Sequence, residues 1–320
     1  MPDPIPFIEA IAATQQHSRS LLVGNGFSYS YFNYNNLLNN AGLETNPSLL
    51  SLFDAFTTVD FELVIRHLEE AATVEERYNK LSRALALRKE ANKLRRALVH
   101  AIRAVHPNFH TEISGLDSAF AFISNFSKLF TLNYDFLLHW VRLRDPQMFK
   151  DGFGLGDDDG EFRGPFSEAA WCNVYNVHGG LHLFADPNGD VRKRLGEPAI
   201  IEAITKTISK DNRLPLYVAE GTSLQKLSKI FGSPYLRHCF EQLKECEGVF
   251  FIFGHSADRN DEHIYDQLFR SKIEHLYFCI HRPNPVKVTE LNAELERYKA
   301  RASSKVDFTF VDSGTANVWT

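Results

Sequence analysis

The most constraining feature of the sequence is a short apolar run that ends in two closely spaced glycines near the N-terminus. Residues 20–28 read Ser-Leu-Leu-Val-Gly-Asn-Gly-Phe-Ser. Such a run is typical of a buried parallel strand followed by a tight turn. Glycine lets a ligand approach the backbone, and the N–H groups at the start of a helix favour anions. The stretch predicts a phosphate-binding turn formed by Gly24, Asn25, Gly26, Phe27 and Ser28.

The glycine pattern also has a plainer interpretation. Tyr29 stands where the dinucleotide-binding fingerprint has its third glycine, so a simple strand–helix turn remains the alternative. The aromatic residues Phe32 and Tyr34 follow so closely that we expect them at the edge of a pocket, although aromatics also fill cores.

Further along the chain, short apolar runs alternate with segments of helical periodicity. Strands that alternate with helices predict an α/β fold with a Rossmann-like parallel sheet that helices cover on both faces. Ligands bind beyond the carboxyl ends of the strands in such sheets. Residues 186–190, Asp-Pro-Asn-Gly-Asp, predict a turn at a hairpin tip. We expect further strands at 128–131, 173–177, 214–218, 249–253, 276–280 and 306–311, and helices at 136–144, 198–209, 223–230, 234–246, 263–271 and 286–299.

Residues from about 45 to 115 interrupt this alternation after the first strand and helix. Residues 75–105 are rich in Ala, Leu, Glu, Lys and Arg, a composition typical of a long helix or a helix pair. Asp60 can cap an earlier helix. Apolar residues follow Asp60 at the spacing of one helical face: Phe61, Val64, Ile65 and Leu68. We therefore expect an all-helical insertion within a single domain of residues 1–320.

The insertion needs a partner for its apolar face. We expect it to cover the ligand pocket as a lid or to form an assembly surface. Arg95 and Arg96 would then lie on a solvated face that suits polar partner contacts. The alternative is that the insertion packs only on its own core.

Composition limits the classes of partner. The chain has 35 Lys and Arg against 40 Asp and Glu, so its net charge is −5. Mild acidity gives no support to a large nucleic-acid-binding surface, although it leaves room for a local basic patch. Asp157, Asp158 and Asp159 lack the spacing of a calcium loop and are expected in a solvated acidic loop.

The cysteines and the apolar runs point to a soluble cytoplasmic protein without a metal. Cys172, Cys239, Cys246 and Cys279 form no C-x-x-C pair, so we expect reduced thiols and no structural zinc. The N-terminus has neither a basic start nor an apolar signal core, and no apolar run is long enough to cross a bilayer.

Polar residues that suit a nucleotide follow four of the expected strands directly. Parallel strands end at one edge of a sheet, so these segments should meet there. Each also has an ordinary interpretation: Asn133 and Asp135 could cap the next helix, His178 is one of 13 histidines, and Gly254 and Ser256 could form a plain turn. The segments are 24–28, 131–135, 176–180 and 253–258.

These motifs make the sequence recognisable. It resembles the sirtuin-like superfamily, and most closely the bacterial sirtuin-like NADase domains of anti-phage defence proteins. The segments 220–223 with Lys226, and 233–236, resemble a subfamily of uncharacterised bacterial proteins. The resemblance spans residues 21–280, and its motifs are Gly-Asn-Gly-Phe-Ser, Thr-Leu-Asn-Tyr-Asp, Val-His-Gly and Phe-Gly-His-Ser-x-Asp-x-x-Asp-Glu-His-Ile.

The resemblance implies roles for the matching residues. Asn133 and Asp135 would hold the nicotinamide ribose and carboxamide, and His178 would be the catalytic histidine. Gly254 and Ser256 would form a second loop near the phosphates and the adenosine ribose. Gly24, Asn25, Gly26 and Ser28 would form the diphosphate loop.

The resemblance implies NAD as the substrate, and the chemistry agrees with the residue types. The nicotinamide nitrogen of NAD is already cationic, so it leaves as a neutral group while the ribose gains oxocarbenium character. Asn133 can orient ribose or water, His178 titrates in the range of a general base, and Asp135 can accept from the carboxamide. No metal is required.

We therefore expect an NAD⁺ hydrolase that releases nicotinamide and ADP-ribose. As a defence effector it would need restraint by a regulatory partner protein or by homo-oligomer formation. The alternatives are a non-catalytic nucleotide-binding sensor, a Rossmann dehydrogenase that uses Glu44 on the ribose, and a protein deacylase. The absence of a four-cysteine zinc module and of a Gly-Ile-Pro-Asp-Phe-Arg segment speaks against the deacylase.

Overall fold

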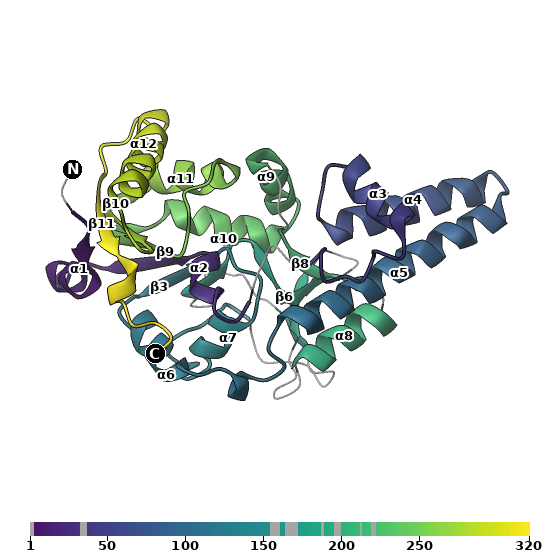
Figure 1. The fold of residues 1–320 in the computed structure, drawn as a ribbon, viewed down its shortest axis with the longest axis horizontal. Coiled ribbons are helices and arrows are strands. Elements are labelled where there is room, and N and C mark those ends of the chain that lie inside the picture. The colour runs from purple at the N-terminus through teal and green to yellow at the C-terminus, as the bar shows by residue number, and fades with distance from the viewer. Residues whose placement is uncertain are drawn as a thin grey trace.

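A computed structural model describes residues 3–32, 37–153, 161–163, 172–186, 189–194, 200–211, 213–218 and 222–320. Its centre is a seven-stranded parallel sheet in the order β1-β11-β10-β9-β2-β3-β5 (Figure 1). Without the edge strand β1, the order along the sheet is 3-2-1-4-5-6 in chain sequence, which is the Rossmann order. The strands are β1 (Ile5–Pro6), β2 (Arg19–Val23), β3 (Lys128–Thr131), β5 (Val174–Asn176), β9 (Glu247–Phe253), β10 (Lys272–Ile280) and β11 (Asp307–Asp312).

The sheet is buried on both faces, as its apolar runs predict. Leu21 and Val23 pack into one core with α1 (Phe7–Ala13), α6 (Leu116–Ile123) and α7 (Leu137–Arg142). Leu22 points to the opposite core, which is formed with α10 (Pro234–Lys244), α11 (Glu262–Phe269) and α12 (Pro285–Arg301). The expected Rossmann-like α/β fold is therefore confirmed, and those strands and helices that the sequence predicted lie within a few residues of their expected positions.

A second, antiparallel sheet was not expected from the sequence. Its order is β4-β7-β6-β8, with β4 (Glu161–Arg163), β6 (Gly179–Ala185), β7 (Val191–Arg194) and β8 (Pro215–Tyr217). The turn expected at 186–190 joins β6 and β7, although residues 187–188 lie outside the described part of the chain. The helix expected at 198–209 is α8 (Ile200–Lys210), which follows β7.

The assignment of residues 214–218 to the parallel sheet was wrong. β8 pairs with β6, because the chain turns out of the main sheet at Gly179 (φ +75°), directly after His178. The Val218 N–H donates to the His178 carbonyl (2.8 Å), so the end of β8 returns to the end of β5. A side chain at Gly179 would lie 2.1 Å from the Leu216 carbonyl oxygen, so this approach requires glycine.

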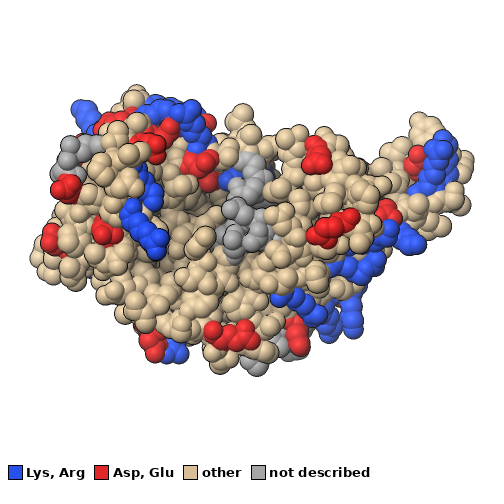
Figure 2. All heavy atoms as spheres, in the orientation of Figure 1, with Lys and Arg blue, Asp and Glu red and all other residues tan. Residues whose placement is uncertain are grey.

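The expected helical insertion is confirmed. It contains α3 (Pro47–Ala55), α4 (Phe61–Arg77), α5 (Leu81–Val105) and the short helix η2 (His110–Glu112), and α4 and α5 form a hairpin that projects from the rest of the molecule (Figure 1). The Asp60 carboxylate caps α4 by accepting the Glu62 N–H (2.9 Å). Lys and Arg side chains gather along the edge formed by α5 and α8 (Figure 2). No helix among the described residues is long and apolar enough to cross a membrane.

The structure corrects one residue of the insertion's expected solvated face. Arg96 is exposed, but Arg95 is buried in the hairpin, where it pairs with Glu69 of α4. The hairpin is also tied to the rest of the chain. Lys229 in α9 (Ser223–Phe231) lies 2.9 Å from Asp60 and 2.6 Å from Glu62.

Asp60 should therefore hold the base of the insertion. Asp60→Ala removes the α4 cap and one partner of Lys229, and we expect it to lower the free energy of unfolding by about 1–2 kcal/mol. Chemical denaturation measures this effect. Asp54→Ala, on the exposed side of α3, is the matched control and should change the value by less than about 0.5 kcal/mol. Equal effects of the two substitutions would contradict the assignment.

Candidate functional site

A cavity of about 1070 Å³ lies at the carboxyl edge of the parallel sheet. Loops that follow β2, β3, β5, β9, β10 and β11 all contribute to its wall. β2 and β9 are neighbours in the sheet, and the strand order reverses between them. This is the point at which open α/β sheets bind ligands. The expected meeting of strand ends at one edge is thus present.

The loop that follows β2 and the loop that follows β9 both contain glycines, and they contact each other at the switch point, where the strand order reverses. The Gly26 N–H donates to the Gly254 carbonyl (2.7 Å), and the Gly24 N–H donates to the Phe253 carbonyl (2.9 Å). A Cβ on Gly26 would lie 2.6 Å from the Gly254 Cα, and Gly254 itself has φ +72°. The glycines therefore allow close contact between the loops. Two of the N–H groups expected to hold phosphate are already engaged with the protein.

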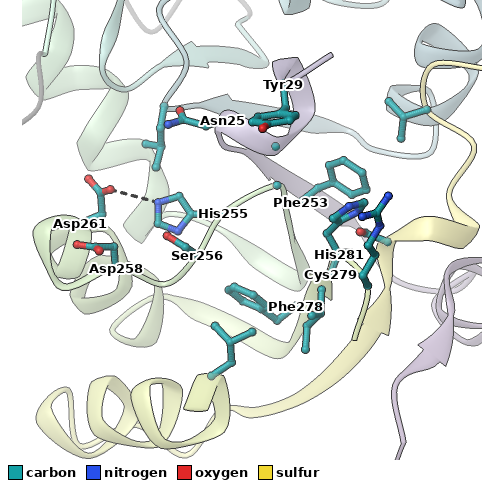
Figure 3. A pocket seen from close by; sticks show the side chains of 18 of the residues that line it. Asn25, Tyr29, Phe253, His255, Ser256, Asp258, Asp261, Phe278, Cys279 and His281 are labelled. Carbon is teal, nitrogen blue, oxygen red and sulfur yellow. Dashed lines mark hydrogen bonds and ion pairs between the residues drawn. The ribbon is translucent and has the colours of Figure 1, made fainter. Parts of the chain in front are cut away.

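The residues of the first loop divide between the cavity and the core. Asn25 and Gly26 line the cavity, as do Gly254 and Ser256 from the second loop (Figure 3). Phe27 is fully buried between Phe122 and Trp319, so its side chain belongs to the core.

Of the two aromatic residues expected at the pocket edge, the structure describes only Phe32. Phe32 is buried against His106 and Tyr134, so the expectation of a pocket-edge role for it was wrong. Its ring is apolar enough to be drawn into the core instead. Tyr34 lies outside the described residues.

Ser28, Asn133 and Asp135 form a buried polar cluster beneath the first loop. The Asn133 amide donates to the Gly24 carbonyl and to the Ser28 hydroxyl (both 3.0 Å). Ser28 also bonds to the Asp135 carboxyl, which accepts the Leu137 N–H (2.7 Å). Burial raises the pKa of Asp135 to about 6. The structure thus brings these predicted residues together, but among the described residues they are not part of the cavity wall.

One atom of this cluster has no partner. The Asn133 Oδ1 is buried and accepts no hydrogen bond from any described residue. A buried acceptor without a donor is costly, and in native structures such an atom calls for an explanation.

His178 does line the cavity, and it is almost fully buried. Its Nε2 lies 3.4 Å from the Nε2 of His263, whose Nδ1 is 3.0 Å from the Ser223 hydroxyl. The Ser223 hydroxyl accepts the His263 backbone N–H (3.2 Å), and its second lone pair can accept the proton on Nδ1 of His263. In this arrangement His263 accepts at Nε2 from His178, and Nδ1 of His178 keeps its lone pair. Burial lowers the pKa of His178 well below its usual value, so the ring is neutral at pH 7.

An ionised pair stands beside the histidines. Asp261 accepts from Lys226 Nζ (2.8 Å) and from His255 Nε2 (3.2 Å). Burial opposes ionisation of Asp261, but the hydrogen bond from His255 and the neighbouring positive charges hold the pKa of Asp261 far below its usual range. The Nδ1 of His255 accepts from Tyr265 (2.6 Å) and from the Ala257 N–H (3.0 Å), so His255 carries its proton on Nε2. Figure 3 shows His255 and Asp261 joined at the cavity wall.

The sequence contained these residues without revealing their roles. Asp261 and His263 stand in the last recognised motif, and Ser223 and Lys226 follow Glu220 and Gly221, which lie outside the described residues. Ser223 is placed by a capping box, in which Thr222 and Gln225 exchange hydrogen bonds at the start of α9. The capping-box spacing Thr222-x-x-Gln225 is the signal that could have indicated the start of a helix at this position.

Three of the described side chains lie close enough to share a metal ion. The ligand atoms of His178, Asp261 and His263 are all within 4.8 Å of one another. However, the ammonium of Lys226 already supplies a positive charge at the Asp261 oxygen nearest to His178. The donor types suit a divalent cation, while this ammonium disfavours one electrostatically.

Comparison with models of known protein families assigns the chain to a family. The model of a family described as Domain of unknown function (DUF4917) matches residues 21–319. This range includes both glycine loops, the buried polar cluster and the histidine pair. A search of curated proteins found no match.

Gly26 should tolerate no side chain. We expect Gly26→Ala to separate the two loops and to destabilise the fold by about 1–3 kcal/mol, because the new Cβ would meet backbone. Thermal unfolding measures the effect. Gly232→Ala is the control: Gly232 has φ −73° and a Cβ there would lie 3.3 Å from the nearest atom. A Gly26→Ala protein as stable as this control would refute the packing role.

Asp135 should make the protein less stable as the pH rises. Its folded pKa of about 6 lies above the ordinary 3.8, so the folded state keeps a proton that the unfolded state has lost. The stabilisation is complete below about 3.8 and is lost as the pH rises through about 6. Asp135→Asn should flatten this dependence, by an amount on the order of 1–3 kcal/mol between pH 4 and 7.

Chemical denaturation at a series of pH values tests this expectation. Asp211→Asn, at an exposed position, should keep the pH dependence of the parent. An unchanged profile for Asp135→Asn would mean that Asp135 titrates normally.

Proposed function

The chain belongs to the DUF4917 family, and from its site we propose that it is an NAD⁺ glycohydrolase that releases nicotinamide and ADP-ribose. The observation that carries the proposal is a buried, neutral histidine, His178, in the wall of a large cavity at the switch point of a Rossmann-ordered sheet. The motifs that resemble sirtuin-like NADase domains support the same activity.

The cavity has room and chemistry for a dinucleotide. We assign the diphosphate to the part of the cavity wall formed by Asn25, Gly26 and Gly254, where the side-chain amide of Asn25 can donate because the Gly26 N–H already donates to Gly254. The adenosine would extend past Ser256 toward the loop that follows β10. The nicotinamide ribose would lie toward His178 and Lys226, on the side of β3 and β5.

His178 would act as the general base. Nicotinamide leaves as a neutral group and the ribose gains positive charge, so the remaining task is to take a proton from water as it attacks. A neutral imidazole can accept that proton, and the His263–Ser223 pair fixes its orientation. The ionised Asp261 nearby would stabilise the charge on the imidazolium that forms.

Asn133 and Asp135 would support the reaction from beneath the first loop. They hold the Gly24 carbonyl and Ser28 in place, so in this proposal they are positioning residues. The unpartnered Asn133 Oδ1 would become satisfied if a ligand or water draws the loop into its working form.

A nucleotide-binding sensor on the same fold is the second candidate. It is favoured by one observation: Asn133 and Asp135 lie outside the described cavity wall, so binding would not require them to meet the substrate.

We further propose a cytoplasmic protein that depletes NAD in anti-phage defence, needs no metal, and is restrained by a partner protein or by homo-oligomer formation.

The test is release of nicotinamide from NAD⁺ by the purified protein, alone and with the products of neighbouring genes. His178→Ala should lower turnover by at least about 100-fold, because a general base contributes about 10²–10⁴-fold. Asn133→Ala should also abolish cleavage, and EDTA should leave the parent rate unchanged. His17→Ala, which lies before β2 and therefore at the opposite edge of the sheet, should behave as the parent.

The outcomes separate the two candidates. Near-normal turnover by folded His178→Ala would remove His178 from the mechanism. NAD⁺ binding by calorimetry without cleavage under every activating condition would favour the sensor. Activity that is lost with EDTA and restored by zinc would instead assign a metal to the His178–Asp261–His263 cluster.

A further inference from the structure

The outer side of α5 is an exposed helical face that is apolar at one end and positively charged along the rest. Its residues share one side of the helix because they are separated by three, four or seven positions. The opposite side packs on α4 through Ala84, Ala91 and Leu94. The outer face of α5 consists of Leu81, Leu85, Lys89, Asn92, Arg96 and Arg103, all exposed.

Apolar residues occupy the end of this face at the hairpin tip. The side chains of Leu81 and Leu85 are 60% and 64% exposed, and they stand one helical turn apart. Single exposed leucines need no explanation, whereas two adjacent ones on a projecting helix offer an apolar surface that a partner could cover.

Cations occupy the rest of the face. α5 carries seven Lys and Arg but only one acidic residue, Glu90. Arg88 pairs with Glu76, and Lys93 with Glu90. Within the described residues, however, Lys89 and Arg96 have no acidic partner.

The positive charge continues beyond α5. Arg103 donates to Thr205 of α8, which adds the exposed Lys206 and Lys210. Figure 2 shows the resulting row of Lys and Arg along this edge. On a chain of net charge −5, this is a concentrated local field that favours an acidic partner.

The combination of apolar and basic residues on this face argues against two other partners, a nucleic-acid duplex and a second copy of the chain. A nucleic-acid duplex would neutralise the cations but leave Leu81 and Leu85 uncovered. A second copy that pairs α5 with α5 in antiparallel fashion over its length would bring Lys89 opposite Arg96. Such like-charge contacts destabilise an interface.

We propose that the outer face of α5 binds an acidic amphipathic helix of a partner protein. Apolar residues of that helix would cover Leu81 and Leu85, and its carboxylates would face Lys89 and Arg96. These two cations are seven residues, or about 10.5 Å, apart, so acidic residues seven positions apart on the partner helix match them. The inference does not depend on the catalytic proposal.

Fluorescence anisotropy with two synthetic helical peptides tests this directly. The acidic peptide has 21 residues, two leucines one turn apart near one end, and Glu at seven-residue spacing toward the other. The basic peptide is identical except that Lys replaces each Glu. The parent protein should bind the acidic peptide at least about tenfold more tightly than the basic one, and this preference should weaken as salt is added.

Charge reversal should invert the preference. The double variant Lys89→Glu/Arg96→Glu should lose at least about tenfold in affinity for the acidic peptide and should prefer the basic one. Arg270→Glu/Lys305→Glu is the matched control, because it makes the same change in net charge at exposed positions elsewhere. Leu85→Asp should weaken binding of both peptides, since it removes the apolar contact.

Four outcomes of the binding measurements would overturn the proposal. They are no binding of the acidic peptide to the parent, equal binding of both peptides, equal loss in the control variant, and tighter binding of a 20-base-pair DNA duplex than of the acidic peptide. Circular dichroism of each variant confirms that the fold is intact. A dimer of the parent in sedimentation that Leu85→Asp dissociates would assign the face to a second copy instead.

Discussion

The contact between the two glycine loops determines how the whole carboxyl edge of the sheet is built. It joins the ends of β2 and β9 by hydrogen bonds from Gly24 and Gly26, so the two central strands of the sheet end together. A side chain at either glycine would collide with the facing loop. From this fixed point the loops that follow the outer strands diverge, and they enclose the cavity between them. The cavity is therefore a consequence of the loop contact at the switch point, where open α/β sheets bind their ligands.

Local sequence was sufficient for the inner strands of the main sheet, because these strands are buried on both faces. A run such as residues 249–253 is apolar throughout and is bounded by a turn, so its position can be read without knowing its neighbours. Pairing cannot be read in this way. Residues 214–218 have the same apolar pattern, yet they join β6, because Gly179 diverts the chain and β8 returns beside it. Strand partners depend on such long-range contacts, which no short segment contains.

For the candidate site, too, local sequence indicated where residues lie along the sheet but not their long-range contacts. The sequence placed Asn133, Asp135, His178 and Gly254 at one edge, which follows from parallel strands alone. The sequence could not show which of these side chains line the cavity and which are buried beneath it. Asn133 turns inward because the Gly24 carbonyl and Ser28 accept its amide protons. Nor could the sequence indicate that His263 meets His178 and that Ser223 meets His263, because Ser223 and His263 come from the starts of α9 and α11. Which helix start faces a strand end is decided by tertiary packing.

At the candidate site the ionised Asp261 and its partners lie beside a pair of neutral histidines, an arrangement that suits the proposed chemistry. Lys226 and His255 satisfy the Asp261 carboxylate, so the ionised groups are compensated where they stand. The histidine pair beside them can then remain buried and neutral, which costs less than burying a second cation. Proton uptake by His178 would place a positive charge on a ring whose Nε2 lies 3.9 Å from Asp261 Oδ1. In the proposed reaction, Asp261 would favour the imidazolium of His178 as it forms, while the resting protein keeps the ring neutral, as a general base requires.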